Sequence, residues 1–296
     1  MKIKSIYKGI CYTVIASLFW GVPQPLFFNE IKFIPPIEVI SHRSIWAFIF
    51  LLITVLGLGK INKFILLFKS YKKLLVLSIT AILISSNWIG FILAVNINRV
   101  QDASMGYYIS PMISIALGYF FLNEKMSYLK LLSILMMLCS LIFLLVNLKT
   151  IPLLAILIGT TWAVYGLLRK QVDVSSEIGL LYESGFISLL AAPYIIYLGF
   201  ENNGFFLNHT NKTSIFLILT GAVTIFPLFF FNIGIKYIPL GFVGVIFYLT
   251  PTFHFFTSIF LLNESLNIYK QISFIIIWIA IGIFLIDKYL EDRKLS

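Results

Sequence analysis

Apolar residues run through the chain in long stretches that short polar segments separate. A bilayer core about 30 Å thick needs roughly 20 apolar residues in a helix, and each stretch reaches about that length. Strands of a membrane barrel would show about ten residues of alternating character instead, so the pattern predicts an all-α membrane protein. The ten predicted membrane-spanning helices cover residues 9–29, 36–57, 73–95, 103–122, 128–147, 151–168, 178–199, 213–235, 241–262 and 268–287.

The composition agrees with this pattern, since 60% of the 296 residues are hydrophobic and only 11% are charged. The longest connection, around residues 201–212, is too short for a soluble domain. A net charge of +10 would fit a nucleic-acid partner, but the basic residues are spread over many loops, so none is expected. Cys11 and Cys139 fall inside predicted helices, where thiols behave as small apolar groups. We therefore predict no disulfide, no metal site and no cofactor.

The basic residues predict the orientation of the chain in the membrane. Cytoplasmic loops carry an excess of Lys and Arg. With ten spans and a cytoplasmic N-terminus, sixteen basic residues, Arg169 among them, lie in or beside inner loops, five lie outside, and Arg43 lies within a span. Both termini are therefore predicted to be cytoplasmic.

The two halves of the chain resemble each other. The stretch YYISPMISIALGYFFLNEKMSYLK from Tyr107 aligns without a gap with FYLTPTFHFFTSIFLLNESLNIYK from Phe247, at an offset of 140 residues. A weaker match places Trp20 against Trp162. We predict two five-helix repeats, residues 1–148 and 149–296. Because five is odd, the second repeat enters the membrane from the opposite side. Inverted repeats of this kind are a transporter architecture, with the binding site near the midplane between the halves.

Several short motifs carry a resemblance to a known family. They are LFWG at 18–21, HRSIW at 42–46, NW at 87–88, AVN at 94–96, ASMGYYISP at 103–111, YGLLRK at 165–170 and YES at 182–184. The ten predicted spans and the LNE that follows each mid-helix proline belong to the same pattern. Together with these motifs, they make the chain resemble the drug/metabolite transporter superfamily with EamA-type repeats, and more narrowly its RarD branch. The resemblance implies a multi-pass permease of the bacterial inner membrane.

Charged residues inside the predicted spans need a reason to be there. On insertion scales an ionised side chain at the bilayer centre costs about 2.5–3.5 kcal/mol, so such residues usually face protein or water. Arg43 lies about 10 Å below the outer surface, at 1.5 Å per residue from Pro36. We predict that His42 and Arg43 face a cavity, while a snorkelling Arg43 is the alternative.

Glu183 lies near the repeat equivalent of His42 and Arg43, but closer to the inner side. It is either a carboxylate that binds and releases a proton, or a structural carboxylate held by Tyr182, Ser184 or another hydroxyl. Whether Glu183 pairs directly with Arg43 stays open, as does the role of His254, a core residue or a ligand.

Further polar and aromatic residues complete the predicted binding site. Their hydrogen-bonding groups and ring faces suit a flat or amphipathic organic solute, although Trp and Tyr also form interfacial belts. These residues are Asn87, Trp88, Tyr108, Tyr165 and Tyr248. Pro111 and Pro251 occupy equivalent positions in mid-helix and are predicted hinges. The pairs Asn123-Glu124 and Asn263-Glu264 are predicted to end one helix and favour the start of the next.

These features favour a secondary carrier over other classes of membrane protein. It would move a small organic metabolite or drug by alternating access, with protons as a candidate coupling ion through Glu183 or His42. The chain has no GxxxxGK[ST] phosphate loop, so ATP-driven transport of the usual kind is not expected. We do not expect an enzyme, but an intramembrane enzyme acting on lipid or peptide is the alternative. Import and export both stay open, and so does the oligomeric state.

Overall fold

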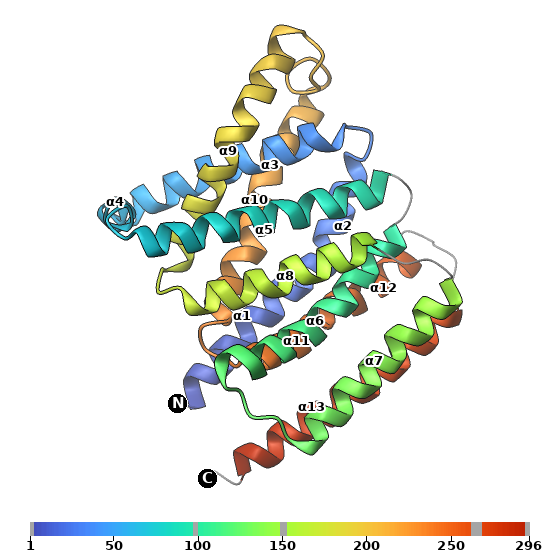
Figure 1. Cartoon of the computed structure of the whole chain (residues 1–296). Coiled ribbons are helices and arrows are strands. Elements are labelled where there is room, and N and C mark those ends of the chain that lie inside the picture. Colours follow the sequence, from blue (N-terminus) through green and yellow to red (C-terminus); the bar gives the residue numbers. More distant parts are fainter. Residues whose placement is uncertain (1–2, 97–99, 149–152, 262–267, 294–296) are drawn as a thin grey trace.

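The computed structural model describes residues 3–96, 100–148, 153–261 and 268–293, and every regular element in these ranges is a helix (Figure 1). The prediction of an all-α protein is confirmed. Elements of the first half are α1 Ile3–Gly21, α2 Pro23–Glu30, α3 Pro36–Gly57, α4 Ile61–Leu67, α5 Tyr71–Asn96, α6 Val100–Leu122 and α7 Tyr128–Leu148. Those of the second half are α8 Leu153–Gln171, α9 Ser176–Phe200, α10 Asn211–Gly234, α11 Leu240–Phe247, α12 Leu249–Phe260 and α13 Ile268–Arg293.

Eight helical stretches in the described part of the chain are long and apolar enough to cross a membrane. They coincide with eight of the predicted spans. The two remaining predicted spans, 103–122 and 268–287, correspond to shorter apolar helices, Gly106–Leu122 and Gln271–Asp287. The described part of the chain thus contains eight candidate spans and two shorter apolar helices.

Prolines and polar residues determine where several helices begin and end. The sequence predicts one helix over 9–29, but the structure divides it into α1 and α2 at Val22, which has φ −123° and ψ −69°. A proline disfavours helical backbone in the residue before it, so Pro23 ends α1 and then begins α2. Asn123 has a φ of 53° at the end of α6, as expected for a residue that stops a helix.

The connections divide between two sides of the molecule. Figure 1 shows both labelled termini, α4 and the α10–α11 turn on the left-hand side, whereas the α2–α3 turn lies at the upper right and the 201–210 connection at the top. Helices of the two halves pack against each other in the pairs α6 with α8, α3 with α9, α3 with α10 and α7 with α13. Each half therefore contacts the other through several helices.

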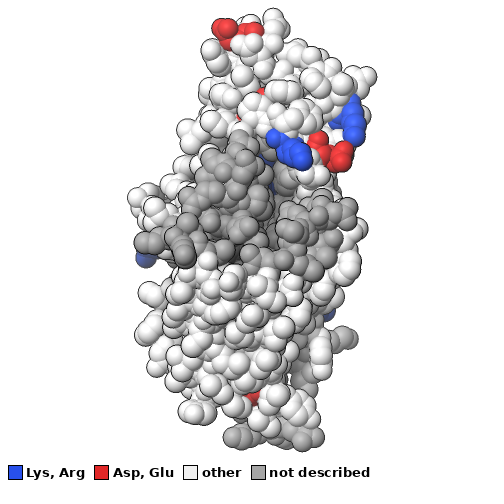
Figure 2. All heavy atoms as spheres, turned by 90° about the vertical axis from the view of Figure 1, so that its right-hand side faces the viewer, with Lys and Arg blue, Asp and Glu red and all other residues white. Residues whose placement is uncertain are grey.

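The outer surface is apolar and the centre is aromatic. Figure 2 shows few charged side chains on one broad face, most of them near its upper end. Leu135 and Leu138 on α7 and Ile275 on α13 are exposed, as a lipid-facing surface requires. At the centre, the Trp162 ring lies 5.0 Å from that of Trp20 and 4.8 Å from that of Phe231, measured between centroids.

Candidate functional site

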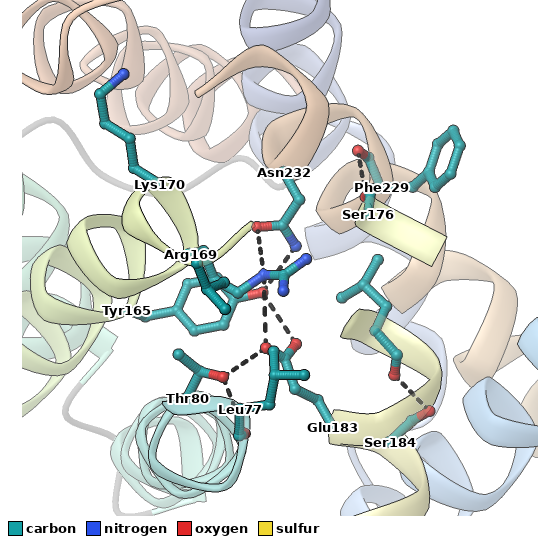
Figure 3. A network of polar contacts seen from close by, with 12 residues as sticks. Leu77, Thr80, Tyr165, Arg169, Lys170, Ser176, Glu183, Ser184, Phe229 and Asn232 are labelled. Carbon is teal, nitrogen blue, oxygen red and sulfur yellow. Dashed lines mark hydrogen bonds and ion pairs between the residues drawn. The ribbon is translucent and has the colours of Figure 1, made fainter. Parts of the chain in front are cut away.

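Glu183 is the buried carboxylate around which four helices meet. It lies on α9 and only 2% of it is exposed. The Thr80 hydroxyl of α5 lies 2.6 Å from its Oε1, and the Tyr165 hydroxyl of α8 donates to its Oε2 at 3.2 Å (Figure 3). Arg169, also on α8, places Nε 3.5 Å from Oε1. A buried charge needs such partners, because leaving one unpaired is strongly destabilising.

Asn232 of α10 closes the network. Its Nδ2 donates to the Tyr165 hydroxyl at 2.8 Å, and its Oδ1 accepts from Arg169 Nε at 3.3 Å (Figure 3). With its proton directed to Glu183, the Tyr165 hydroxyl both accepts and donates. Of the partners that the structural interpretation of Glu183 named, another hydroxyl is what the structure shows, supplied by Thr80 and Tyr165. Tyr182 instead bonds Ser78 at 2.8 Å, and Ser184 bonds the Leu180 carbonyl at 2.8 Å.

Arg169 was not among the predicted site residues. From the sequence it was counted with the basic residues in or beside the inner loops, whereas the structure places its side chain in the Glu183 network. Its side chain is fully buried. The signal for this was its spacing, because Arg169 lies one helical turn after Tyr165 and so shares its face. Room for the guanidinium comes from Gly179 on α9, where an added Cβ would lie 2.1 Å from Arg169 Nη1.

Arg43 forms a second polar cluster on α3. Its Nε donates to the Thr224 hydroxyl of α10 at 2.5 Å. Its guanidinium carbon lies 4.2 Å from the centroid of the Trp88 ring and 5.4 Å from that of Phe28. Both distances are within the range of cation–π attraction, which strengthens when water is excluded. Arg43 is therefore held inside the protein, with 3% of its surface exposed, and does not snorkel.

A small cavity of about 10 Å³ separates the two clusters. Glu183 and Ser184 line it from α9, and Trp88 and Thr224, the partners of Arg43, line it from α5 and α10. A cavity of this size holds about one water molecule. It is too small for an organic solute, so the conformation described is closed around this point.

The other predicted polar residues lie away from this cavity. His42 Nδ1 accepts from Trp46 Nε1 at 3.2 Å, and its ring packs against Phe206, with 4.9 Å between centroids. It therefore faces the 201–210 connection rather than Glu183. His254 Nε2 lies 2.8 Å from the Trp20 carbonyl oxygen, and Asn87 Nδ2 donates to the Ile158 carbonyl at 2.8 Å. Both contacts hold one helix to the backbone of another.

Two of the predicted tyrosines, Tyr108 and Tyr248, and the predicted hinges lie where α6 packs against α11 and α12. The Tyr248 hydroxyl donates to the Tyr108 carbonyl at 3.0 Å, and both tyrosines are buried. Pro111 lies inside α6, and an added Cβ on Gly244 of α11 would lie 3.0 Å from its carbonyl oxygen. Pro251 follows the break at Tyr248, between α11 and α12. Proline cannot donate the backbone bond that would continue the helix there.

Glu124 joins the two halves at the other end of α6. The prediction placed it at the start of the next helix, α7, but its Oε1 and Oε2 accept from Leu240 N and Gly241 N at 2.5 and 2.9 Å. These groups begin α11, whose free N–H donors favour an anion. The start of α7 is capped by Ser127, which accepts from Lys130 N at 3.1 Å. The corresponding prediction for Asn263 and Glu264 lies outside the described residues.

Comparison with known proteins identifies the family. The EamA-like transporter family matches the chain twice, at residues 7–146 and 149–286. Protein RarD of Escherichia coli K12 is 29% identical over 296 residues, 100% of both chains. An uncharacterized transporter of Bacillus subtilis 168, YojE, is 32% identical over 280 residues, 94% of this chain and 93% of its own. A solved crystal structure, 14% identical, has the same fold with a TM-score of 0.71 and covers 93% of this chain and 96% of its own. The chain is therefore a multi-pass membrane transporter of the EamA family, in the branch of RarD.

Proposed function

We propose that the protein is a secondary carrier of a small organic metabolite or drug that works by alternating access around the cavity between Arg43 and Glu183. The observation that carries the proposal is the position of this cavity. It lies between helices of both halves. The side chains that line it include the buried carboxylate of Glu183 and two residues that contact the buried cation Arg43. Intramembrane ionisable residues of this kind mark solute and ion pathways.

We further propose that residues 1–148 and 149–296 are inverted repeats of five spans each, which gives ten in total. The packing pairs support this, because exchanging the halves converts α6–α8 into α12–α1 and α3–α10 into α9–α5, and all four pairs occur. Predicted equivalents also touch each other, as Trp20 does Trp162 and Tyr108 does Tyr248. Contact between equivalent residues is what a two-fold axis produces. In this arrangement both termini are cytoplasmic, following the basic loops.

Each cluster has its own role in the proposed cycle. Arg43, whose guanidinium lies over the Trp88 and Phe28 rings, attracts the anionic group of an acidic or zwitterionic solute, and the rings offer a platform for a flat apolar part. Glu183 takes up and releases the coupling proton. His42, which bonds Trp46, supports α3 from the outer side. Pro111 and Pro251 serve as bending points when the cavity opens to one side or the other.

Transport by the purified protein in liposomes tests this proposal. A panel of labelled organic acids and amino acids is supplied outside vesicles loaded with the unlabelled compounds. We expect counterflow of at least one compound. In vesicles without internal solute, a proton gradient alone should drive transport of that compound, and Glu183→Gln should abolish this proton-driven transport. Hydrolysis or transfer of lipid or peptide without any counterflow would favour the intramembrane enzyme instead. Experiments with the gradient reversed distinguish import from export.

A further inference from the structure

The Thr80 hydroxyl has two acceptors but only one proton to donate. Its Oγ1 lies 2.9 Å from the Leu77 carbonyl oxygen, three residues earlier on α5, and 2.6 Å from Glu183 Oε1 (Figure 3). A hydroxyl carries a single O–H and two lone pairs, so it cannot donate to both oxygens at once. Thr80 is fully buried, so bulk water does not supply the hydrogen bond that one of these two acceptors lacks.

Both directions of this hydrogen bond are chemically complete, and each requires a different protonation state of Glu183. When Glu183 is ionised, Thr80 donates to Oε1. When Oε1 carries a proton, Oε1–H donates to Thr80 Oγ1 and the Thr80 proton turns to the Leu77 carbonyl, whose second lone pair can accept it. We propose that Thr80 is a positioning residue that lets Glu183 bind and release the coupling proton without moving from its place. This inference rests on the proposed role of Glu183 as the coupling carboxylate.

The step is a single proton transfer and leaves no other group changed. A proton from bulk solvent reaches Oε1 through water in the adjoining cavity, which is left as neutral water. The new O–H bond forms at Oε1, and the carboxylate loses its negative charge. The Thr80 O–H bond rotates but does not break. Neutralising Glu183 removes the Coulomb attraction between its carboxylate and the guanidinium of Arg169, whose Nε lies 3.5 Å from Oε1. Proton uptake therefore weakens the contact between α8 and α9 on the side where Arg169 lies.

Few other ionisable side chains lie near Glu183 in the described part of the chain. Arg169 and Tyr165 face it from α8. Among the described residues, α5 contributes the Thr80 hydroxyl and α10 contributes the Asn232 amide, and neither group is ionisable. From α3 the cavity is lined by Ala47 and Leu51. Arg169 and Tyr165 both contact the Glu183 carboxylate, so we assign the coupling proton to Glu183 itself.

Infrared difference spectroscopy of the purified full-length protein against pH tests the inference without knowledge of the solute. The carboxylic C=O band of protonated Glu183 is identified by its absence in Glu183→Gln. A hydrogen bond to an ionised group is about twice as strong as one between neutral groups. Thr80→Val removes that bond while keeping the shape, so we expect the midpoint of the band to move by about one pH unit in favour of the protonated form, a tenfold change in affinity.

Two variants serve as controls. Thr80→Ser keeps the hydroxyl and is expected to titrate like the wild type. Thr220→Val removes a fully buried hydroxyl that also bonds the carbonyl three residues earlier, Leu217, but contacts no carboxylate among the described residues. It is expected to leave the midpoint unchanged. If Thr80→Val does not fold, Thr80→Cys, with its weak S–H donor, replaces it and is expected to show a shift in the same direction.

The outcomes separate the inference from the function on which it rests. A titrating Glu183 band whose midpoint is the same in wild type and Thr80→Val overturns the role of Thr80 and leaves the coupling carboxylate in place. Equal shifts in Thr80→Val and Thr220→Val also overturn it, because a general packing change would then be the cause. If the wild type shows no titrating band that Glu183→Gln removes, the coupling role of Glu183 itself is refuted.

Discussion

Gly179 makes room for the one buried guanidinium that faces Glu183, so Gly179→Ala is expected to disrupt the centre of the transporter. An added Cβ would lie 2.1 Å from Arg169 Nη1 and 2.6 Å from Cζ. Both distances are far inside ordinary contact, so something must shift. Arg169 is fully buried and its Nε is held by Asn232 and Glu183. The substitution is therefore expected to displace the guanidinium and to break its pairing with Glu183.

The size of the effect follows from two opposing contributions. Breaking a buried ion pair from one side costs about 3–5 kcal/mol, because a charge is left uncompensated. Alanine in place of glycine inside a helix returns about 1 kcal/mol. The net destabilisation is therefore about 2–4 kcal/mol. At about 2–4 °C per kcal/mol for a chain of 150–250 residues, the midpoint of thermal unfolding should fall by roughly 5–15 °C.

Thermal unfolding of the purified protein in one detergent measures this, with Gly199→Ala as the matched control. Gly199 lies on the same helix, and an added Cβ there meets nothing within 4 Å. It is expected to keep or slightly raise the midpoint. In an Arg169→Met background, which lacks the guanidinium, Gly179→Ala should have much less effect than in the wild type. If Gly179→Ala and Gly199→Ala unfold at the same temperature, or if the loss persists without Arg169, the described position of Arg169 is wrong.

Three further predictions concern other contacts of the site. Glu183→Gln should abolish proton-driven transport in liposomes while expression stays normal, and unchanged uptake and pH dependence would remove Glu183 from the mechanism. Arg43→Ala should weaken anionic and zwitterionic competitors at least tenfold more than cationic ones, since a lost charge-assisted bond is about 1.5–3 kcal/mol; equal effects in a competition series would make Arg43 structural. Glu124→Ala removes the acceptor of two α11 N–H groups and should speed hydrogen exchange of Leu240 and Gly241 by tenfold or more, whereas unchanged exchange would contradict the contact.

The sequence predicts the helices well because each needs only local information. Twenty apolar residues in a row specify a span wherever they pack, and Pro36 and Asn123 mark helix ends through their own backbone preferences. The break before Pro23 was not predicted, although the same preference causes it. The centre of the site is predicted in part for the same reason. Glu183 and Arg43 are conspicuous because a charge inside a span requires an explanation.

The partners of these charges depend on how helices pack, which no local pattern specifies. Thr80, Thr224 and Asn232 look like ordinary polar residues of apolar helices, and only the packing of α5 and α10 against α9 and α3 brings them to Glu183 and Arg43. Arg169 is the clearest example. Its position near the end of a span matches a basic flanking residue, and its burial follows from the glycine on α9 that receives it.

Labelling of Ser184→Cys from either side of the membrane tests the central claim most directly. Ser184 lines the cavity, and replacing the two native cysteines, Cys11 and Cys139, leaves it as the single thiol. If the two halves alternately open this cavity, a membrane-impermeant thiol reagent should modify the residue from the cytoplasmic side and, separately, from the opposite side. Leu189→Cys, at an exposed apolar position on the same helix, should stay unmodified within the lipid. A thiol at position 184 that neither side can reach would contradict a central, alternately accessible site.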